Sequence, residues 1–169
     1  MEDSTLQGQM MNRRAARDAA RDNGETPYEA NVLVPTHAGT VQHHGADGDL
    51  PDLQTAQNDT QHRFHCHQVM GRLLQVNRLG GISFAFIRSD GVELQLCVTR
   101  EEAASSACLA SANLGDFVWA MGPTILTRQG KRAILVRSMR IVTRSIAPLP
   151  GKALRGDDTA TDPAWRRAN

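Results

Sequence analysis

The chain has 169 residues, which suffices for one domain with a modest core and tails. Apolar residues make up 40% of it and aromatic residues only 4%, and no apolar run is long enough to span a membrane. The three cysteines are widely spaced and the N-terminus lacks the basic start and apolar stretch of a signal peptide. These features argue against a disulfide framework and predict a cytoplasmic protein.

The net charge of +1 hides a strong segregation along the chain. Residues 1–60 hold four arginines and ten acidic residues, a net charge of −6, whereas residues 61–148 hold eleven basic and five acidic residues, a net charge of +6. A basic core behind an acidic leader suits an anionic partner. An ordinary basic surface explains the charge equally well, so charge alone does not decide.

The N-terminal third predicts little packed structure. Residues 1–10 are polar and are expected to be disordered, while residues 11–24 are rich in Ala and Arg and end at a glycine, which predicts a short, weakly packed helix. Residues 25–61 are rich in Gly, Asp, Gln and Asn and predict an extended, flexible linker. At the other end, residues 147–169 are expected to form a C-terminal tail.

Residues 62–146 carry the pattern of an ordered domain. Strands are predicted within 65–78, at 82–88, at 92–98, at 116–126 with a bulge or bend at Gly122-Pro123, and at 132–143, and a helix-length segment fills 101–115. The predicted fold is therefore all-β, a five-stranded OB-fold Greek-key barrel with a helix between strands 3 and 4. A short N-terminal helix and a flexible linker precede it.

The second and third strands carry the candidate binding face. In 92–98, Leu94, Leu96 and Val98 alternate with Glu93, Gln95 and Cys97, which predicts that the leucines point inward and Gln95 outward. Small inward residues on 82–88 would leave Phe84 and Phe86 outside, where they can stack bases, although the pattern alone favours a core position for both. Neighbouring basic residues would contact phosphates. The candidate nucleic-acid-binding residues are Phe84, Gln95, Phe86, Asn77, Arg78, Arg128, Lys131 and Arg132.

Several short motifs follow one another in a family-specific order. They are Arg13-Arg14, Gly24 to Tyr28 (GETPY), Thr36-His37, Gly71-Arg72, Gly80, Ser83-Phe84, Gln95-Leu96, Leu114-Gly115-Asp116, Pro148-Leu149-Pro150 with Lys152, and, faintly, Thr161-Asp162-Pro163. In order and spacing they resemble the N-terminal, anticodon-binding region of bacterial-type lysyl-tRNA synthetases. The resemblance covers nearly the whole chain except residues 38–60.

The resemblance implies an OB-fold and an RNA partner, the anticodon loop of a tRNA. It also implies that Phe84 stacks on the central anticodon base and that Gln95 reads the edge of that base. Two positions depart from the family. Val76-Asn77 stands where the family brings a basic pair, with Arg78 expected on the opposite face, and Lys131 stands where the family's loop often has a glutamate. The departures favour single-strand binding in general over lysine-anticodon specificity.

The family's class II catalytic domain has no counterpart after Pro150, and no Gly-rich phosphate loop follows a strand. We therefore expect a binding module without enzymatic activity or cofactor. The alternatives are an accessory subunit that docks a synthetase or another protein, and a truncated synthetase fragment. The cluster His65-Cys66-His67 lacks a second ligand pair at zinc spacing, so no metal is expected, and a solvent-facing strand start is the preferred interpretation.

Overall fold

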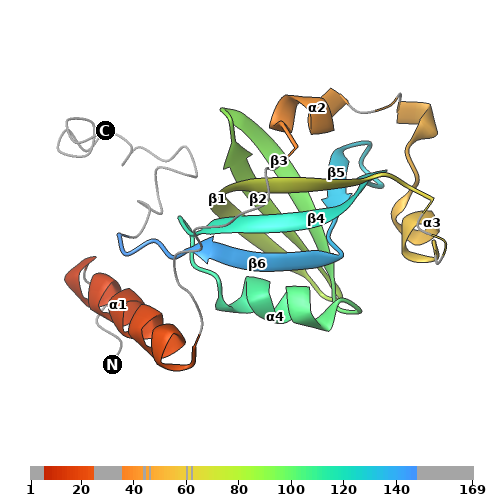
Figure 1. The fold of residues 1–169 in the computed structure, drawn as a ribbon. Coiled ribbons are helices and arrows are strands. Elements are labelled where there is room, and N and C mark those ends of the chain that lie inside the picture. Colours follow the sequence, from red (N-terminus) through yellow and green to blue (C-terminus); the bar gives the residue numbers. More distant parts are fainter. Residues whose placement is uncertain are drawn as a thin grey trace.

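The structure, a computed structural model, describes residues 6–24, 36–43, 45, 47–59, 61 and 63–147. The Pro27-Tyr28 and Pro148–Pro150 motifs and nearly all of the expected C-terminal tail lie outside the described residues. The elements are α1 (Leu6–Asp22), α2 (Ala38–His43), a 3-10 turn η1 (Asp47–Asp49), α3 (Leu53–Gln57), β1 (Cys66–Leu79), β2 (Ile82–Ser89), β3 (Val92–Thr99), α4 (Ala103–Ser111), β4 (Phe117–Leu126), β5 (Arg132–Leu135) and β6 (Ser138–Thr143) (Figure 1).

Six strands form one sheet in the order β1-β2-β3-β5-β4-β6, and β1 also pairs with β4. The strands β1, β2, β3, β5 and β4 therefore close into a ring. Its pairings are antiparallel except for the short parallel contact of β3 with β5, which joins Leu96 to Ile134 and Cys97 to Leu135. The predicted β-rich fold with a helix after the third strand is confirmed, since α4 lies between β3 and β4.

The predicted fifth strand, 132–143, is two strands. The chain leaves β5 at Leu135 and pairs with β4 again from Ser138, so β5 and β6 lie along different parts of the same neighbour. β4 itself runs without a break through Gly122-Pro123, where a bulge or bend was predicted. The glycine is explained by close approach, because a Cβ at Gly122 would collide with the carbonyl of Leu135.

The interior of the ring is filled by aliphatic side chains, as the alternation predicted for β2 and β3. Burying one such side chain stabilises the fold by about 1.5–3 kcal/mol. Leu109 of α4 and Ala38 and Val41 of α2 belong to the same cluster and cover the ends of the ring. The main inward residues are Val69, Leu73, Ala85, Ile87, Leu94, Leu96, Val98, Val118, Ala120 and Ile134.

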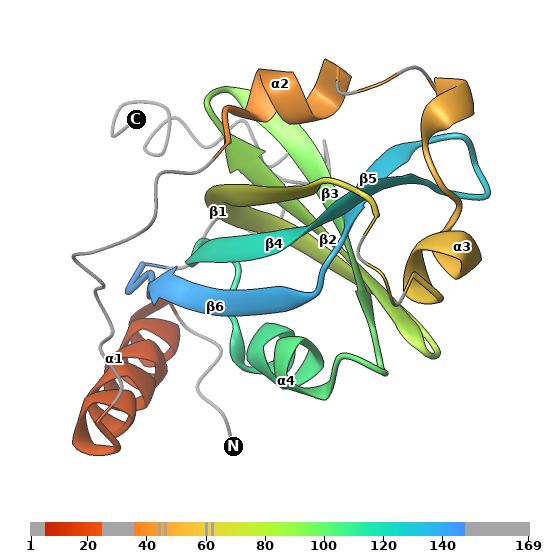
Figure 2. The same cartoon turned by 45° about the vertical axis from the view of Figure 1, so that its right-hand side comes forward.

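The described part of the predicted flexible linker, residues 36–59 with gaps at 44 and 46, differs from that prediction. It carries α2, η1 and α3, and Ala38, Val41 and Ala56 are almost completely buried. Each element is short and buries only one or two small apolar residues, so no helical periodicity is visible in the sequence. The segment runs along the outside of the ring, with α2 and α3 over different parts of it (Figure 2).

The N-terminal helix α1 begins at Leu6, so residues 6–10, which were expected to be disordered, are helical. Its end agrees with the prediction, because Gly24 adopts a φ of 79° just beyond Asp22. The helix is anchored by Arg13, whose Nη1 donates to the carbonyls of Leu114 at 3.1 Å and Ser145 at 3.2 Å. Burial lowers the pKa of Arg13. Because a polar side chain holds α1 in place, its docking does not require an apolar stripe in the sequence.

None of the helices among the described residues is long and apolar enough to cross a membrane.

Candidate nucleic-acid interface

The outward side chains of β1, β2 and β3 stand in rows, because directly paired residues of antiparallel strands share one face. Phe86 of β2 is paired with Gln95 of β3. One row further along, Phe84 is paired with Cys97 on one side and with Asn77 of β1 on the other. The two phenylalanines and the glutamine therefore lie next to one another on the outside of the ring.

A groove with a volume of about 860 Å³ lies over these rows, and we call it the outer groove. Its walls come from β1, β2, β3, the turn between β4 and β5, and α3. The volume is in the range typical of ligand-binding sites, about 300–1,000 Å³. Six of the eight candidate residues line it: Phe84, Phe86, Gln95, Asn77, Arg128 and Lys131.

The remaining two candidates lie elsewhere. Arg78 follows Asn77 along β1 and so points to the opposite face, as the alternation predicted, and it does not line the outer groove. Arg132 begins β5 and donates from Nη2 to the carbonyl of Gly45 at 2.7 Å. The structure thus brings six candidate residues together and separates two from them.

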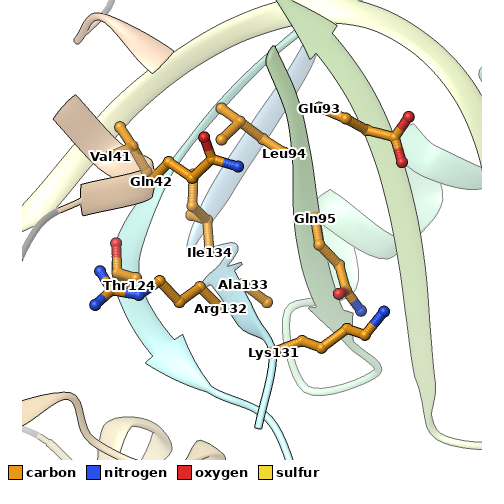
Figure 3. Close-up of a pocket in the computed structure, with 10 residues that line it drawn as sticks. All are labelled: Val41, Gln42, Glu93, Leu94, Gln95, Thr124, Lys131, Arg132, Ala133 and Ile134. Atoms are coloured by element: carbon orange, nitrogen blue, oxygen red, sulfur yellow. The ribbon is translucent and has the colours of Figure 1, made fainter. Parts of the chain in front are cut away.

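Arg132 lines a smaller hollow of about 270 Å³ between α2, β3, β4 and β5 (Figure 3). The hollow exists because β3 and β5 pair over only two residues and leave space between their other ends. In Figure 3, Gln95 and Lys131 reach toward one another on one side of this hollow, while Arg132 and Thr124 lie on the other. Since Gln95 and Lys131 also line the outer groove, the two hollows adjoin at these residues.

Part of the outer face is covered by α3. Ala56 of α3 packs with Cys97, Ile125, Ala133 and Leu135 in a second apolar cluster outside the ring. Cys97, predicted to lie on the open binding face, is on that face but is fully buried, and burial raises the pKa of its thiol to about 11. A residue outside a ring of strands can still be buried when a helix lies over it, and α3 lies over Cys97.

The helix α3 was not predicted from the sequence, although several contacts fix it in place. Its N-cap is Asp52, whose Oδ1 accepts from the backbone N–H of Thr55 at 2.7 Å, and this hydrogen bond lowers the pKa of Asp52. Arg137 donates to the carbonyl of Ala56, and the N–H of Leu126 donates to Pro51 at 2.9 Å. The signal that could have revealed the helix was Asp52, a preferred N-cap residue.

The two phenylalanines differ in their surroundings. Both are partly exposed, but Phe84 packs against the second apolar cluster beneath α3, whereas Phe86 belongs to neither cluster. Phe86 and Gln95 therefore lie apart from both apolar clusters, whereas one side of Phe84 packs against the second cluster.

The histidine cluster at the start of β1 is only partly at the surface. The rings of His65 and His67 lie edge to face with centroids 4.7 Å apart, so they share a side of the chain. His65 and Cys66 are exposed, but His67 is 1% exposed, so the predicted solvent-facing strand start is wrong for His67. The described residues contain no group of three or more potential metal ligands.

Comparison with known proteins points to one family. No family model matches the chain. It is 32% identical over 142 residues to the lysine–tRNA ligases of Mycobacterium bovis and Mycobacterium tuberculosis, and the match covers 82% of this chain and 26% of those proteins. For the ligase of Cupriavidus taiwanensis the identity is 28% over 125 residues, with 72% and 23% covered.

A further match is the lysylphosphatidylglycerol biosynthesis bifunctional protein LysX of a Mycobacterium species, 34% identical over 87 residues, with 50% of this chain and 8% of that protein covered. The chain spans about a quarter of the length of the curated ligases it matches. The resemblance to lysyl-tRNA synthetases is confirmed: through most of its length, this chain is similar to a region that makes up about a quarter of lysine–tRNA ligases.

Proposed function

We propose that the chain is an OB-fold module that binds single-stranded RNA, the anticodon loop of a tRNA, in its outer groove. The observation that carries the proposal is the groove itself, in which Phe84, Phe86 and Gln95 stand in adjacent positions. The ring order of the strands and the helix between β3 and β4 support the OB topology.

The chemistry of the groove suits an unpaired base. An aromatic ring stacks on any base, and a neighbouring amide offers both a donor and an acceptor for the base edge. Phe86 packs in neither apolar cluster, and the amide of Gln95 is its cross-strand neighbour. Phe84 offers a second platform on its uncovered side.

The turn between β4 and β5 supplies positive charge beside this platform. Arg128 and Lys131 line the groove and are exposed, so they can meet phosphates without losing an ion pair with a buried acid. Phosphate contacts of this kind supply sequence-independent affinity. The names of the relatives support tRNA as the source of the RNA.

We further propose that the module binds without catalysing a reaction, needs no cofactor and acts in the cytoplasm. Its binding residues are amides, phenylalanines and cations, a set suited to recognition. Lysine-dependent exchange of pyrophosphate into ATP by the pure chain would contradict this part of the proposal.

The test is a fluorescence titration of short single-stranded RNA with the full chain at several salt concentrations. We expect binding whose logarithm falls linearly with log salt, by about 0.7 per phosphate contacted. A duplex of the same sequence should compete poorly, because its bases are stacked and closed to the groove. Absence of binding, or equal binding of the duplex, would contradict the proposal.

A second candidate is a module that docks an enzyme subunit, since the relatives carry this region as one part of a much longer enzyme chain. In that case the chain would bind a protein partner with an affinity that single-stranded RNA does not displace. Competition between RNA and the captured partner separates the two candidates.

A further inference from the structure

One end of the outer groove is not used by the proposed RNA contacts. Beyond Phe86 and Phe84, the next outward residue of β2 is Ile82. It is paired with Leu79 of the neighbouring strand β1. Alternate residues of a strand are about 7 Å apart, so Ile82 and Leu79 lie about that distance beyond the row of Phe84. Leu79 is 64% exposed, one of two large hydrophobic residues among the described residues that are strongly exposed. This end of the groove therefore offers an apolar floor.

The second wall at this end is α3. Gln57 and Asn58, at the end of this helix, line the groove. Ala56 packs instead in the second apolar cluster. Successive residues of a helix are turned by about 100°, which explains why one short helix can face both the protein core and the groove. In Figure 2, α3 lies between the β4–β5 turn and the β1–β2 turn, along one side of the sheet.

Two polar side chains at this end, Gln57 and Glu101, are hydrogen-bonded to each other. Nε2 of Gln57 donates to Oε2 of Glu101 at 3.0 Å, and both residues line the groove. An ionised carboxylate can only accept, so the Gln57 amide must turn its NH₂ toward Glu101 and leave its carbonyl oxygen as the remaining acceptor. The Glu101 carboxylate has several acceptor sites and can still take further hydrogen bonds.

On the basis of the proposed RNA binding, we propose that Leu79, Ile82, Gln57 and Glu101 form a second base subsite, selective for guanine. Guanine carries two adjacent donor groups, N1–H and N2–H₂, on one edge, which match the two oxygens of a carboxylate. Uracil has one N–H between two carbonyls. In adenine and cytosine the amino group is next to a ring acceptor, which would face an acceptor of the protein.

The distribution of charge supports this orientation. Lys131 lies beside Gln95, whereas Glu101 comes two residues after Thr99, the last residue of β3 and the pair of Ile82, with the exposed Arg100 between them. A phosphate is attracted to Lys131 and disfavoured directly beside the carboxylate of Glu101. A strand lying along the groove therefore presents a base, and not its backbone, to Glu101.

The test uses the full chain and short single-stranded pyrimidine RNAs that carry one variable base, moved along the strand. We expect the RNA with guanine at the best position to bind about ten-fold more tightly than the same RNA with another base there. Glu101→Gln keeps the size of the side chain and removes the carboxylate. It should abolish the guanine preference and leave the affinity for guanine-free RNA unchanged or slightly higher.

Asp90→Asn is the matched control, because Asp90 is an exposed acid in a turn that lines neither hollow. It should keep the preference. Gln57→Met gives a second readout, with a reduced preference at unchanged general affinity. A wild-type chain that binds RNA without preferring guanine, or a Glu101→Gln variant that keeps the preference, would overturn the inference alone. A wild-type chain that binds none of the RNAs would instead contradict the proposed function.

Discussion

The two faces of β3 show how differently one strand can be used. On the inner face, Leu94, Leu96 and Val98 belong to the apolar core of the ring. On the outer face, Gln95 is partly exposed in the groove, but Cys97 is as completely buried as Leu96, because α3 lies over it. Alternation therefore tells which face a residue occupies, whereas a separate element decides whether that face is open.

Because α3 covers Cys97, only part of the outer face is available for binding. The groove in the outer face lies along the rows beside α3, where Phe84, Phe86 and Gln95 are found. The inner face should control stability alone, whereas the open part of the outer face should control binding. Substitutions on each face can break that separation.

The largest expected effect is on the inner face. Leu96→Ala should lower the free energy of unfolding by about 2–5 kcal/mol, because it opens a cavity in a fully packed interior. Urea unfolding measures this loss, and RNA affinity should persist wherever the variant remains folded. Gln95→Ala, its neighbour on the outer face, is the control and should change stability little. A mild Leu96→Ala variant would contradict the packed interior.

A pH-dependent effect is expected on the covered part of the outer face. The pKa of Cys97 is raised from 9.0 to about 11 by burial, so the folded state holds this proton more tightly than the unfolded state. Its contribution to stability is therefore complete below pH 9.0 and is lost as the pH rises towards 11. The loss amounts to about 2–3 kcal/mol at most. Unfolding curves across this range should show a smaller alkaline loss for Cys97→Ala, and an identical loss would contradict burial beneath α3.

Phe84 packs against the cluster beneath α3 and also lines the groove, so its truncation should affect both stability and RNA binding. Because it packs against the cluster beneath α3 on one side, Phe84→Ala should lower stability by about 1–2 kcal/mol. Loss of its uncovered face should also weaken single-stranded RNA binding by about ten-fold. A thermal melt measured beside a titration separates the two effects. A large fall in the melting temperature with unchanged affinity would make Phe84 a core residue only.

The smallest expected effect is electrostatic. Lys131→Ala should weaken binding of all single-stranded RNAs similarly and reduce the slope of log affinity against log salt by about one unit. Arg78→Ala removes the same charge from the opposite face of β1 and is the matched control. Equal slopes for the two variants would show that charge acts through the whole surface and not through the groove.

Much of the strand pattern could be predicted because the inward side chains are aliphatic and alternate. Leu94, Leu96 and Val98 define the inner face without help from the rest of the chain. The position of the outward phenylalanines followed from the small residues beside them and from the family resemblance. The sequence pattern did not predict α3, since only Ala56 and the partly buried Leu53 pack its inner side, and several of its other contacts are hydrogen bonds to distant residues.

The N-terminal helix was predicted at residues 11–24, but its earlier start at Leu6 and its docking were not. Its docking depends on Arg13, which donates to carbonyls more than a hundred residues away, and no local pattern encodes such partners. Periodicity detects elements that bury a stripe of apolar side chains. The docking of an element that is fixed by a single polar anchor becomes visible only in the structure.

The central claim is that the open part of the outer face binds single-stranded RNA, and Phe86 tests it most directly. Phe86 lines the groove, pairs with Gln95 and belongs to neither apolar cluster. Anisotropy titrations of one short RNA with the wild-type chain and with Phe86→Ala, each beside an unfolding curve, should show a binding loss of about 1–3 kcal/mol at a nearly unchanged unfolding midpoint. Equal RNA affinity of the two folded proteins would contradict the account.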